Sequence, residues 1–358
     1  MTLRSDFSSS FSTSSSSPSS SSSSCTATAS SSTANLGPGY DVFGLGLDAF
    51  EDRVKITTTR KRMTMSNRSK KQITIKMSDE EERSGKKGVG REGGGGITIP
   101  SNPEDNSAGL VVKRMAEDFH IDYDLDINIL KKVPAGFGMG SSAASAAAAA
   151  VAFDNLFDLK IDKTKLVEYA AEGEVASAGT KHYDNVSGSL LGGFVIVRTS
   201  PKLEFIRIEP PKDLVLVIAV PLIKVPKKKT EVARSVLPNA VPLKSVVHNV
   251  SNASTIVAGF MSKDIEMIAK GIDDVIVEPA RKHLIPGYDE VKRKATKAGA
   301  LAVTISGAGP AIISFLKSNK DGKEVADAMA AGFKQAKIES MTVICHPSTG
   351  AKVVSIKK

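Results

Sequence analysis

Residues 133–142 read Val133-Pro134-Ala135-Gly136-Phe137-Gly138-Met139-Gly140-Ser141-Ser142 and run directly into a segment with eight alanines between positions 143 and 152. Glycine at every second position lets the backbone bend and approach a ligand without Cβ clashes. Alanine is the best helix former, so we expect a helix over residues 141–156. Free N–H groups at the loop and at the positive end of this helix would form an anion site. The plainer alternative is a glycine-rich turn in which Ser141 and Ser142 cap the helix.

The loop follows neither of two common phosphate-binding patterns. It does not end in Gly-Lys-Ser/Thr, so it is not a Walker A loop. It also lacks the dinucleotide G-x-G-x-x-G pattern with an acidic residue about 20 positions later.

The composition is that of a globular protein. A chain of 358 residues fits two compact domains, and 41% hydrophobic residues allow a sizeable core. No run of 18 apolar residues is present, so we expect no membrane-spanning helix. Cys25 and Cys345 form neither a metal-binding spacing nor a disulfide framework, which favours a reduced, intracellular protein.

The net charge of +9 raises the alternative of a nucleic-acid-binding protein. Much of the positive charge lies in residues 53–87 and 227–229, and no single basic helix gathers it. Aromatic residues make up only 5% of the chain and tryptophan is absent, so stacking platforms for single strands are scarce. A basic surface also attracts anionic substrates such as ATP, and we expect no nucleic-acid partner.

The N-terminus is a low-complexity segment. Serine occupies 14 of the 17 positions from 8 to 24, so we expect residues 1–24 to form a disordered tail. A serine-rich, acid-poor N-terminus is also typical of plastid transit peptides, but arginine is scarce here. We therefore expect a cytoplasmic protein, with plastid targeting as the alternative.

The remaining pattern mixes strands and helices. We expect a short strand at 25–29, a turn-rich loop at 32–41, strands at 42–47 and 52–59, a half-exposed strand at 72–77, and a charged hairpin tip at 78–96 before a strand at 97–99. Further helices are expected at 106–119, 163–178, 230–237, 243–261, 265–271 and 322–336. Further strands are expected at 124–131, 194–198, 214–220 and 340–345, with a strand pair around 306–310 and a loop at 179–193. This mixture predicts an α+β or α/β fold in two domains.

Two further stretches accompany the glycine loop, Ser32-Thr33-Ala34-Asn35-Leu36-Gly37-Pro38-Gly39-Tyr40-Asp41 and Ser306-Gly307-Ala308-Gly309-Pro310. In order and rough spacing the three resemble the three motifs of the GHMP small-molecule kinases, with Met139 where the family has Leu. The resemblance covers about residues 25–345. It is greatest to the homoserine kinase branch, through residues 172–193, 230–238 (TEVARSVLP) and 278–287.

The resemblance implies an α+β fold with two domains. A 25–205 N-terminal domain would be of the ribosomal S5 domain-2 type, bind ATP and carry a basic hairpin extension near 60–96. A ferredoxin-like C-terminal domain would span 206–358. The implied reaction transfers the γ-phosphoryl of ATP to the hydroxyl of L-homoserine in threonine biosynthesis, with Mg²⁺ as cofactor. We also expect a homodimer and no membrane partner.

Nucleotide and metal residues follow from matched motif positions. The implied ATP-binding residues are Pro134, Ala135, Gly136, Phe137, Gly138, Met139, Gly140, Ser141, Ser142 and Ala143. Ser142 and Glu174 match the Mg²⁺ positions, and Mg²⁺ prefers oxygen ligands. The alternative for Glu174 is an ordinary solvated glutamate.

Acceptor residues follow in the same way. Asn35 and Asp41 match positions that hold the amino and hydroxyl end of homoserine, and a carboxylate is a natural partner for an ammonium. Arg234 and Arg281 match positions that bind its carboxylate, which a guanidinium can hold through two parallel hydrogen bonds. His182 would also contact the substrate. Outside this context a surface salt bridge for each arginine and a structural role for the histidine would be the simpler interpretation.

The implied catalytic residues are Asp41, Asn185 and Thr230. Asn185 stands where several relatives carry an aspartate that deprotonates the acceptor, and an amide cannot be a base. The resemblance therefore implies catalysis by positioning and electrostatics, with Asp41 orienting the hydroxyl. Ala311 departs from the family, which commonly has threonine there, so one hydroxyl contact is missing at the phosphate end.

Three other functions remain open at this stage. A GHMP kinase for mevalonate, pantoate or a sugar would not need both an ammonium site and a carboxylate site, as an amino-acid kinase does, and Asn185 also argues against a mevalonate-type base mechanism. A non-catalytic ligand-binding relative would be expected to lose Glu174, Ser142 or the glycines, and all are present. A nucleic-acid-binding protein would bind in a salt-sensitive way without turnover.

Overall fold

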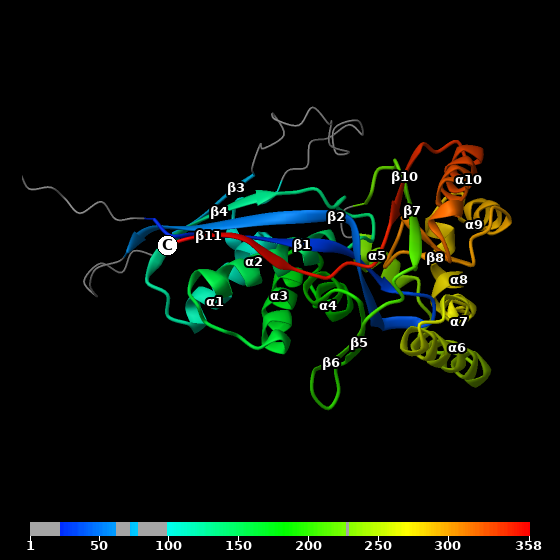
Figure 1. Ribbon diagram of the computed structural model, residues 1–358, viewed down its shortest axis with the longest axis horizontal. Coiled ribbons are helices and arrows are strands. Elements are labelled where there is room, and N and C mark those ends of the chain that lie inside the picture. Colours follow the sequence, from blue (N-terminus) through cyan, green and yellow to red (C-terminus); the bar gives the residue numbers. More distant parts are fainter. Residues whose placement is uncertain (1–21, 62–71, 78–98, 227–228) are drawn as a thin grey trace, which may run out of the picture.

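The structure is a computed structural model that describes residues 22–61, 72–77, 99–226 and 229–358 (Figure 1). Its strands form two sheets, one of seven strands and one of four. Helices cover one face of the larger sheet, and further helices lie beside the smaller one (Figure 1). This arrangement confirms the expected α+β class.

The larger sheet has the central order β11-β1-β2-β4-β3, with β5 paired to β2 and β6 paired to β5. All pairs are antiparallel except β3 with β4, which is parallel. The strands are β1 (Ser24–Asn35), β2 (Gly39–Lys61), β3 (Ile73–Met77), β4 (Tyr123–Leu130), β5 (Phe194–Arg198), β6 (Glu204–Ile208) and β11 (Lys352–Lys357).

Strand β1 corrects the expected short strand and turn-rich loop, because it continues through buried serines to Asn35. Their hydroxyls find partners inside the protein: Ser31 donates to the Leu47 carbonyl and Ser32 to the Asn185 carbonyl, each at 3.0 Å. A buried hydroxyl with a partner loses little of its hydrogen-bonding energy, so a polar sequence can form an interior strand. The two strands expected at 42–47 and 52–59 are parts of one long strand, β2, with an irregularity in its pairing opposite Ser30 and Ser31.

Helices α1 (Ser107–Asp118), α2 (Ser141–Leu156), α3 (Lys163–Ala178) and α4 (Tyr183–Leu191) pack together on one side of the larger sheet (Figure 1). The expected bounds of α2 and α3 are confirmed. A Cβ on Gly173 of α3 would lie 2.9 Å from the Cβ of Ala146 in α2, so the two helices cross closely. The expectation of a loop over 179–193 is wrong for residues 183–191, where α4 packs through Gly188 against β1 and β2.

The smaller sheet has the antiparallel order β10-β7-β9-β8. Its strands are β7 (Val215–Pro221), β8 (Ala302–Ile305), β9 (Ile312–Leu316) and β10 (Ser340–Cys345). The helices of this half are α5 (Lys229–Ser235), α6 (Leu243–Ser262), α7 (Ile265–Gly271), α8 (Val277–Arg281), α9 (Tyr288–Lys297) and α10 (Gly322–Gln335). Short 3₁₀ turns occur at Pro103–Asp105, Lys282–Leu284 and Asn319–Asp321. The sequence did not predict α8, α9, β6 or β11.

Two of these missed strands bear on the division of the chain. Strand β11 returns from the C-terminal end to pair with β1, and β6 pairs with β5, so both lie in the larger sheet. The boundaries 25–205 and 206–358 therefore stay a prediction from resemblance. Most of the serine tail and most of the basic extension at 60–96 lie outside the described residues. Within those residues, no helix is long and apolar enough to cross a bilayer.

A shared apolar core joins the two sheets. Leu45 and Phe194 of the larger sheet, Leu216 of the smaller sheet and Phe260 of α6 belong to one buried cluster. The rings of Phe194 and Phe260 stack in parallel with their centroids 3.9 Å apart. This core fixes the two halves against each other, and the functional segments lie where they meet.

Replacing Phe260 with alanine should therefore lower the free energy of unfolding by about 3–5 kcal/mol, the usual cost of removing a buried phenyl ring. Its neighbour Met261 is 69% exposed, so Met261→Ala should change the free energy of unfolding by less than about 0.5 kcal/mol. Urea unfolding followed by circular dichroism measures both variants. Equal small effects would contradict a packed core between the sheets.

Candidate active site

The turn between β1 and β2 holds an unusual backbone conformation. Asn35, Leu36 and Asp41 all have positive φ angles, of 72°, 49° and 56°. Side-chain hydrogen bonds hold the turn: Asn35 Oδ1 accepts the Asp41 N–H at 3.1 Å, and Asn35 Nδ2 donates to the Gly307 carbonyl at 2.8 Å. Left-handed conformations cost energy for residues other than glycine and gather at functional sites. Two of the expected acceptor residues are thus held in strained positions.

The glycine loop uses the conformational freedom that its sequence predicts. Gly136, Gly138 and Gly140 have φ angles of 85°, 81° and 63°. A side chain on Gly138 would clash with the Ser306 carbonyl and lie 2.8 Å from that of Gly309. The glycines therefore serve both the turn and its close contact with the 306–310 loop.

The serine cap on α2, the plainer alternative for this loop, is not formed. Gly140 occupies the N-cap position, and in the described structure no side chain caps this helix. Ser141 instead donates its hydroxyl proton to the Val133 carbonyl at 2.8 Å, which closes the loop on itself. Because no side chain caps them, the N–H groups of the first turn can bind an anion.

The three motif segments meet at Ser306. Its hydroxyl lies 2.8 Å from the Gly138 carbonyl and 3.0 Å from Thr33 Oγ1. Backbone bonds add to this junction, since the Gly307 N–H donates to the Ala34 carbonyl and the Ala311 N–H to that of Phe137. Stretches that are separated by more than 90 residues in the sequence therefore form one site between the two sheets.

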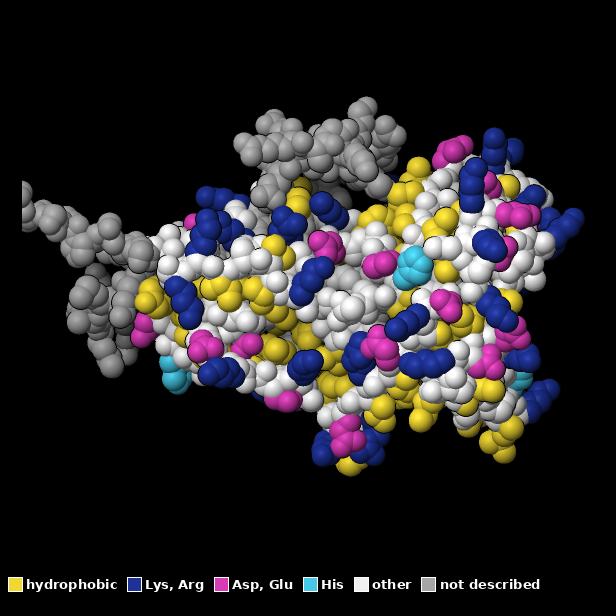
Figure 2. Space-filling view, in the orientation of Figure 1, with side chains coloured by type: hydrophobic (Ala, Val, Ile, Leu, Met, Phe, Trp, Pro, Cys, Tyr) yellow, Lys and Arg dark blue, Asp and Glu magenta, His cyan; other side chains and the backbone are white. Residues whose placement is uncertain are grey.

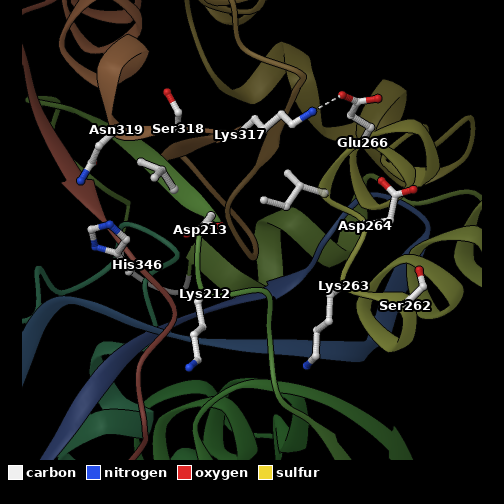
Figure 3. A pocket seen from close by; sticks show the side chains of 12 residues that line it. Lys212, Asp213, Ser262, Lys263, Asp264, Glu266, Lys317, Ser318, Asn319 and His346 are labelled. Carbon is white, nitrogen blue, oxygen red and sulfur yellow. Dashed lines mark hydrogen bonds and ion pairs between the residues drawn. The ribbon is translucent and has the colours of Figure 1, made fainter.

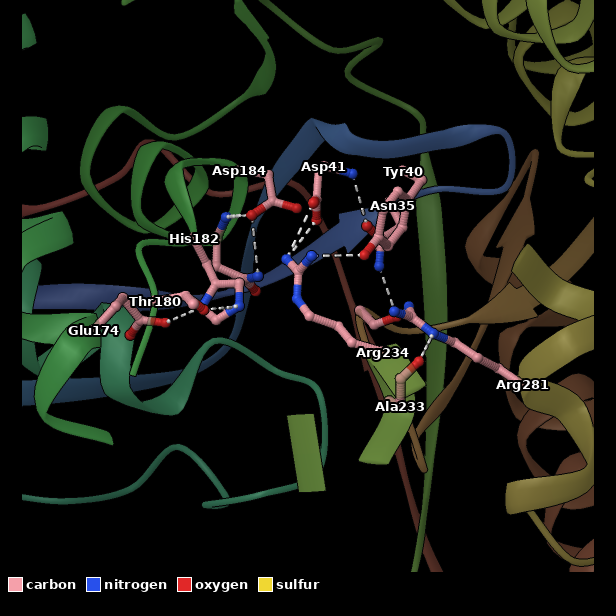
Figure 4. A network of polar contacts seen from close by, with 12 residues as sticks. Asn35, Tyr40, Asp41, Glu174, Thr180, His182, Asp184, Ala233, Arg234 and Arg281 are labelled. Carbon is pink, nitrogen blue, oxygen red and sulfur yellow. Dashed lines mark hydrogen bonds and ion pairs between the residues drawn. The ribbon is translucent and has the colours of Figure 1, made fainter. Parts of the chain in front are cut away.

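A cluster of cations lies beside the turn (Figure 4). Arg234 of α5 donates to both carboxylate oxygens of Asp41 at 3.0 Å and to the Tyr40 hydroxyl at 2.8 Å. Arg281 of α8 is buried and donates to the carbonyls of Ala233 and Gly307. Both guanidinium groups lie near the Tyr40 ring, at 5.6 and 5.1 Å from its centre. The structure thus brings four of the five expected acceptor residues together: Asn35, Asp41, Arg234 and Arg281.

The fifth, His182, lies beside the expected metal residue Glu174. His182 Nδ1 is 3.2 Å from Glu174 Oε2, and its Nε2 is 3.4 Å from Thr180 Oγ1 (Figure 4). Burial favours the neutral imidazole, but the hydrogen bond and charge of Glu174 and the charge of Asp184 outweigh it, so the pKa of His182 is raised. The other oxygen of Glu174, Oε1, is buried without a hydrogen-bond partner among the described residues. An orphaned carboxylate oxygen of this kind fits a cation ligand.

Ser142 and Glu174 sit on facing helices. Glu174 follows Gly173, which contacts Ala146 of α2. Ser142 precedes Ala146 by one helical turn and so shares its face. Glu174 therefore lies at the level of α3 that crosses α2 near Ala146, one helical turn along α2 from Ser142.

Two of the expected catalytic residues, Asn185 and Thr230, lie on elements that border the glycine loop and carry Arg234, respectively. A Cβ on Gly140 would be 3.4 Å from Asn185 Oδ1, so the Asn185 amide borders the glycine loop. Asn185 follows Asp184, whose carboxylate accepts the Asn185 N–H at 2.8 Å. Thr230 begins the helical turn that ends with Arg234, which places both on one face of α5.

Asp184 is a residue that sequence reasoning missed. Its carboxyl group is fully buried, and this burial, with the nearby charge of Asp41, raises its pKa to about 6. The only signal was an acidic residue beside Asn185 in the stretch His182-Tyr183-Asp184-Asn185. A buried acid that titrates near neutrality is common at catalytic sites.

A separate hollow of about 680 Å³ lies in the C-terminal half (Figure 3). Its lining includes Lys212, Lys263, Lys317 and His346, and Lys317 forms an ion pair with Glu266 across it. It shares no residue with the glycine loop or the acceptor cluster.

Family models match both halves of the chain. "GHMP kinases N terminal domain" matches residues 106–193, and "GHMP kinases C terminal" matches residues 256–335. Homoserine kinase from Methanococcus maripaludis is 39% identical over 284 residues, 79% of this chain and 84% of that protein. The enzyme from Thermoplasma volcanium is 37% identical over 292 residues, 81% and 84% of the two chains.

Solved structures agree with these matches. The crystal structure of homoserine kinase from Cytophaga hutchinsonii superposes with a TM-score of 0.79 at 32% identity, covering 92% of this chain and 97% of that one. Mevalonate diphosphate decarboxylase from Staphylococcus aureus, at 16% identity and a TM-score of 0.63, shares the fold.

Fold and motifs together define an ATP-dependent small-molecule kinase of the GHMP class. Within that class, the chain belongs to the homoserine kinase family. The resemblance drawn from the three sequence motifs is confirmed.

Asp184→Asn should stabilise the protein at about pH 7.5. Wild-type Asp184 carries a buried charge there, and a shift in its pKa from 3.8 to about 6 corresponds to roughly 2–3 kcal/mol. An amide oxygen can still accept the Asn185 N–H. The gain should shrink as the pH falls from about 6 to about 4, because wild-type Asp184 then becomes neutral in the folded protein.

Urea unfolding of wild type and Asp184→Asn at about pH 7.5 and pH 4.5 measures this difference. A variant less stable than wild type at the higher pH would show that the neighbouring His182 requires the Asp184 charge.

Proposed function

We propose that the protein transfers the γ-phosphoryl group of ATP to the hydroxyl of L-homoserine, giving O-phospho-L-homoserine for threonine biosynthesis. The observation that carries this proposal is the pairing of Arg234 with Asp41, in a turn that the 306–310 loop connects to the glycine loop. An amino acid carries an ammonium and a carboxylate. Asp41 is a natural partner for the ammonium, and Arg234 is one for the carboxylate.

The Arg234–Asp41 pair can be exchanged for substrate at low cost. The side chains are 36% and 43% exposed, and ion pairs with this exposure contribute about 0–1 kcal/mol. An incoming homoserine would give its ammonium to Asp41 and its carboxylate to Arg234 and Arg281. Asn35 fixes the Asp41 backbone, and His182 borders the same space from α4.

The glycine loop, residues 134–143, would hold the triphosphate through its N–H groups and the positive end of α2. Ser142 and Glu174 would hold Mg²⁺, and the orphaned Glu174 Oε1 supports that assignment. Mg²⁺ bound to ATP neutralises charge on the phosphate oxygens. Two protein ligands suffice, since Mg²⁺ usually completes its shell with phosphate and water.

Phosphoryl transfer then depends on position and charge. Asn185 lies between the glycine loop and the acceptor cluster, where its amide can orient the hydroxyl. Asp41 orients the substrate from the other side, and Thr230 lies on the same helix face as Arg234. No covalent intermediate is needed, because phosphoryl transfer asks mainly for alignment and electrostatic stabilisation.

The alternatives differ in their acceptors. Mevalonate, pantoate and sugars lack an ammonium, so Asp41 would have no cationic group to bind. A nucleic-acid-binding role is disfavoured by the surface, since Figure 2 shows basic side chains interspersed with acidic ones over the visible face. A homodimer and a cytoplasmic location remain predictions.

The acceptor is tested by measuring ADP release with homoserine, mevalonate, pantoate and galactose. We expect turnover with homoserine at a kcat/KM at least about 100-fold above the others, because an acceptor without an ammonium would leave the Asp41 charge without a partner. Turnover with mevalonate and none with homoserine would overturn the proposal.

Arg234→Ala should raise the KM for homoserine by about 10- to 100-fold, the effect of losing a charged hydrogen-bonded partner of about 1.5–3 kcal/mol. The KM for ATP should change far less. Arg293→Ala is the control, because that arginine lies on α9 and pairs with Glu290. Equal changes in both KM values would contradict the assigned role.

A further inference from the structure

The two loops around the phosphate site contain no positive charge of their own. Residues 133–142 and 306–310 include neither lysine nor arginine. Backbone N–H groups can bind phosphate, but a triphosphate carries several negative charges that cations usually help to neutralise. A cation from another segment of the chain would add to the charge that Mg²⁺ supplies.

Lys229, the first residue of α5, reaches this place. Its ammonium donates a hydrogen bond to the Gly309 carbonyl in the 306–310 loop. That same carbonyl oxygen lies 2.8 Å from where a Cβ of Gly138 would be. The ammonium of Lys229 and the glycine loop therefore share one close neighbour.

Val225, which lies before α5 in the described part of the chain, also contacts the glycine loop. Val225 Cγ1 lies 3.1 Å from the Cβ position of Gly136. Val225 thus contacts the glycine loop at Gly136. Lys229 bonds to Gly309, which packs against Gly138 of the same loop. This places Lys229 on the phosphate side of α5, while Arg234 at the other end of the helix faces Asp41.

The charge of Lys229 lacks an acidic partner. Among the described residues, the structure records no ion pair for it, and the charged group that faces it from a neighbouring element is Arg281 of α8, also a cation. Arg234 adds a further positive charge on its own helix. Burial, and then the repulsion from Arg281, lower the pKa of Lys229 to about 7. A partly buried ammonium without a carboxylate is a site in need of an anion.

We propose that Lys229 binds the phosphates of the nucleotide, leaving the Gly309 carbonyl when ATP enters the glycine loop. A flexible four-carbon stem allows that short movement. It supplies charge at the end of the site where Ala311 lacks a hydroxyl. The assignment rests on the proposed function, since it takes the glycine loop as the triphosphate site.

The first test is nucleotide binding by calorimetry with AMP-PCP and Mg²⁺ at about pH 6.5. Lys229→Met should raise the Kd about 10- to 100-fold, and Lys229→Arg should restore most of the affinity. Lys224→Met is the matched control, because Lys224 is an exposed lysine on the same segment, and its loss should change the Kd less than about twofold. Equal values for wild type and Lys229→Met would overturn the proposal.

The second test measures proton uptake on nucleotide binding and uses Lys229→Arg, a variant that keeps the positive charge. At about pH 8, free wild-type Lys229 is largely neutral, and a bound phosphate should raise its pKa and draw in a proton. Binding should therefore take up nearly one more proton in wild type than in Lys229→Arg, which stays charged. Titrations in two buffers of different ionisation enthalpy measure this number, and equal uptake would contradict the proposal.

Kinetics separate this inference from the proposed function. Lys229→Met should raise the KM for ATP and leave that for homoserine nearly unchanged. If wild type binds nucleotide and phosphorylates homoserine while Lys229→Met behaves as wild type, only the role of Lys229 fails. If wild type binds nucleotide but does not turn over homoserine, the acceptor assignment fails. The binding tests then still show whether Lys229 binds the nucleotide phosphates.

Discussion

The contact between Gly138 and the 306–310 loop organises the whole site. Because Gly138 has no Cβ, the carbonyls of Ser306 and Gly309 can lie against it. Ser306 can then bond to Gly138 and Thr33 together, which ties the glycine loop to β1. The Gly307 carbonyl accepts from Asn35 and so fixes the acceptor turn to the same loop. One loop of the smaller sheet thus sets the separation between donor and acceptor ends.

The charged side chains of the site lie where oppositely charged groups of the substrates and Mg²⁺ are expected. Arg234 and Asp41 satisfy each other at the acceptor end, where a zwitterion would replace the pair without leaving either charge alone. Among the described residues, Glu174 keeps one oxygen unpartnered beside His182, and Lys229 keeps an ammonium without an acidic partner near Gly309. Opposite charges are thus left incompletely paired at the two places where Mg²⁺ and phosphate are expected. Such preorganised groups need little rearrangement when the substrate arrives.

The sequence predicted best what local composition determines. Helices α2 and α3 were predicted with their bounds, because alanine content and spacing set them locally. Long-range structure was missed: β11 pairs with a strand more than 300 residues away, and the buried serines of β1 resemble a loop until their partners are known. In the site, motif positions predicted Asn35, Asp41, Arg234 and Arg281 as acceptor residues, and the structure brings these four together. Their bonds to one another, and the burial that shifts the pKa of Asp184, depend on the tertiary fold.

Strain and buried charge gather at the acceptor end. Asn35, Leu36 and Asp41 adopt left-handed backbone conformations, and Asp184 holds a buried carboxyl beside Asp41. Each feature costs folding energy, so the surrounding packing must compensate. The core shared by Phe194 and Phe260 lies between the sheets that carry these residues, and it is apolar and closely stacked. A rigid core of this kind can hold a strained turn in place before substrate binds, because the turn cannot relax without disturbing its bond to Gly307. The rigidity of the interface between the sheets is therefore itself a condition for recognising the acceptor.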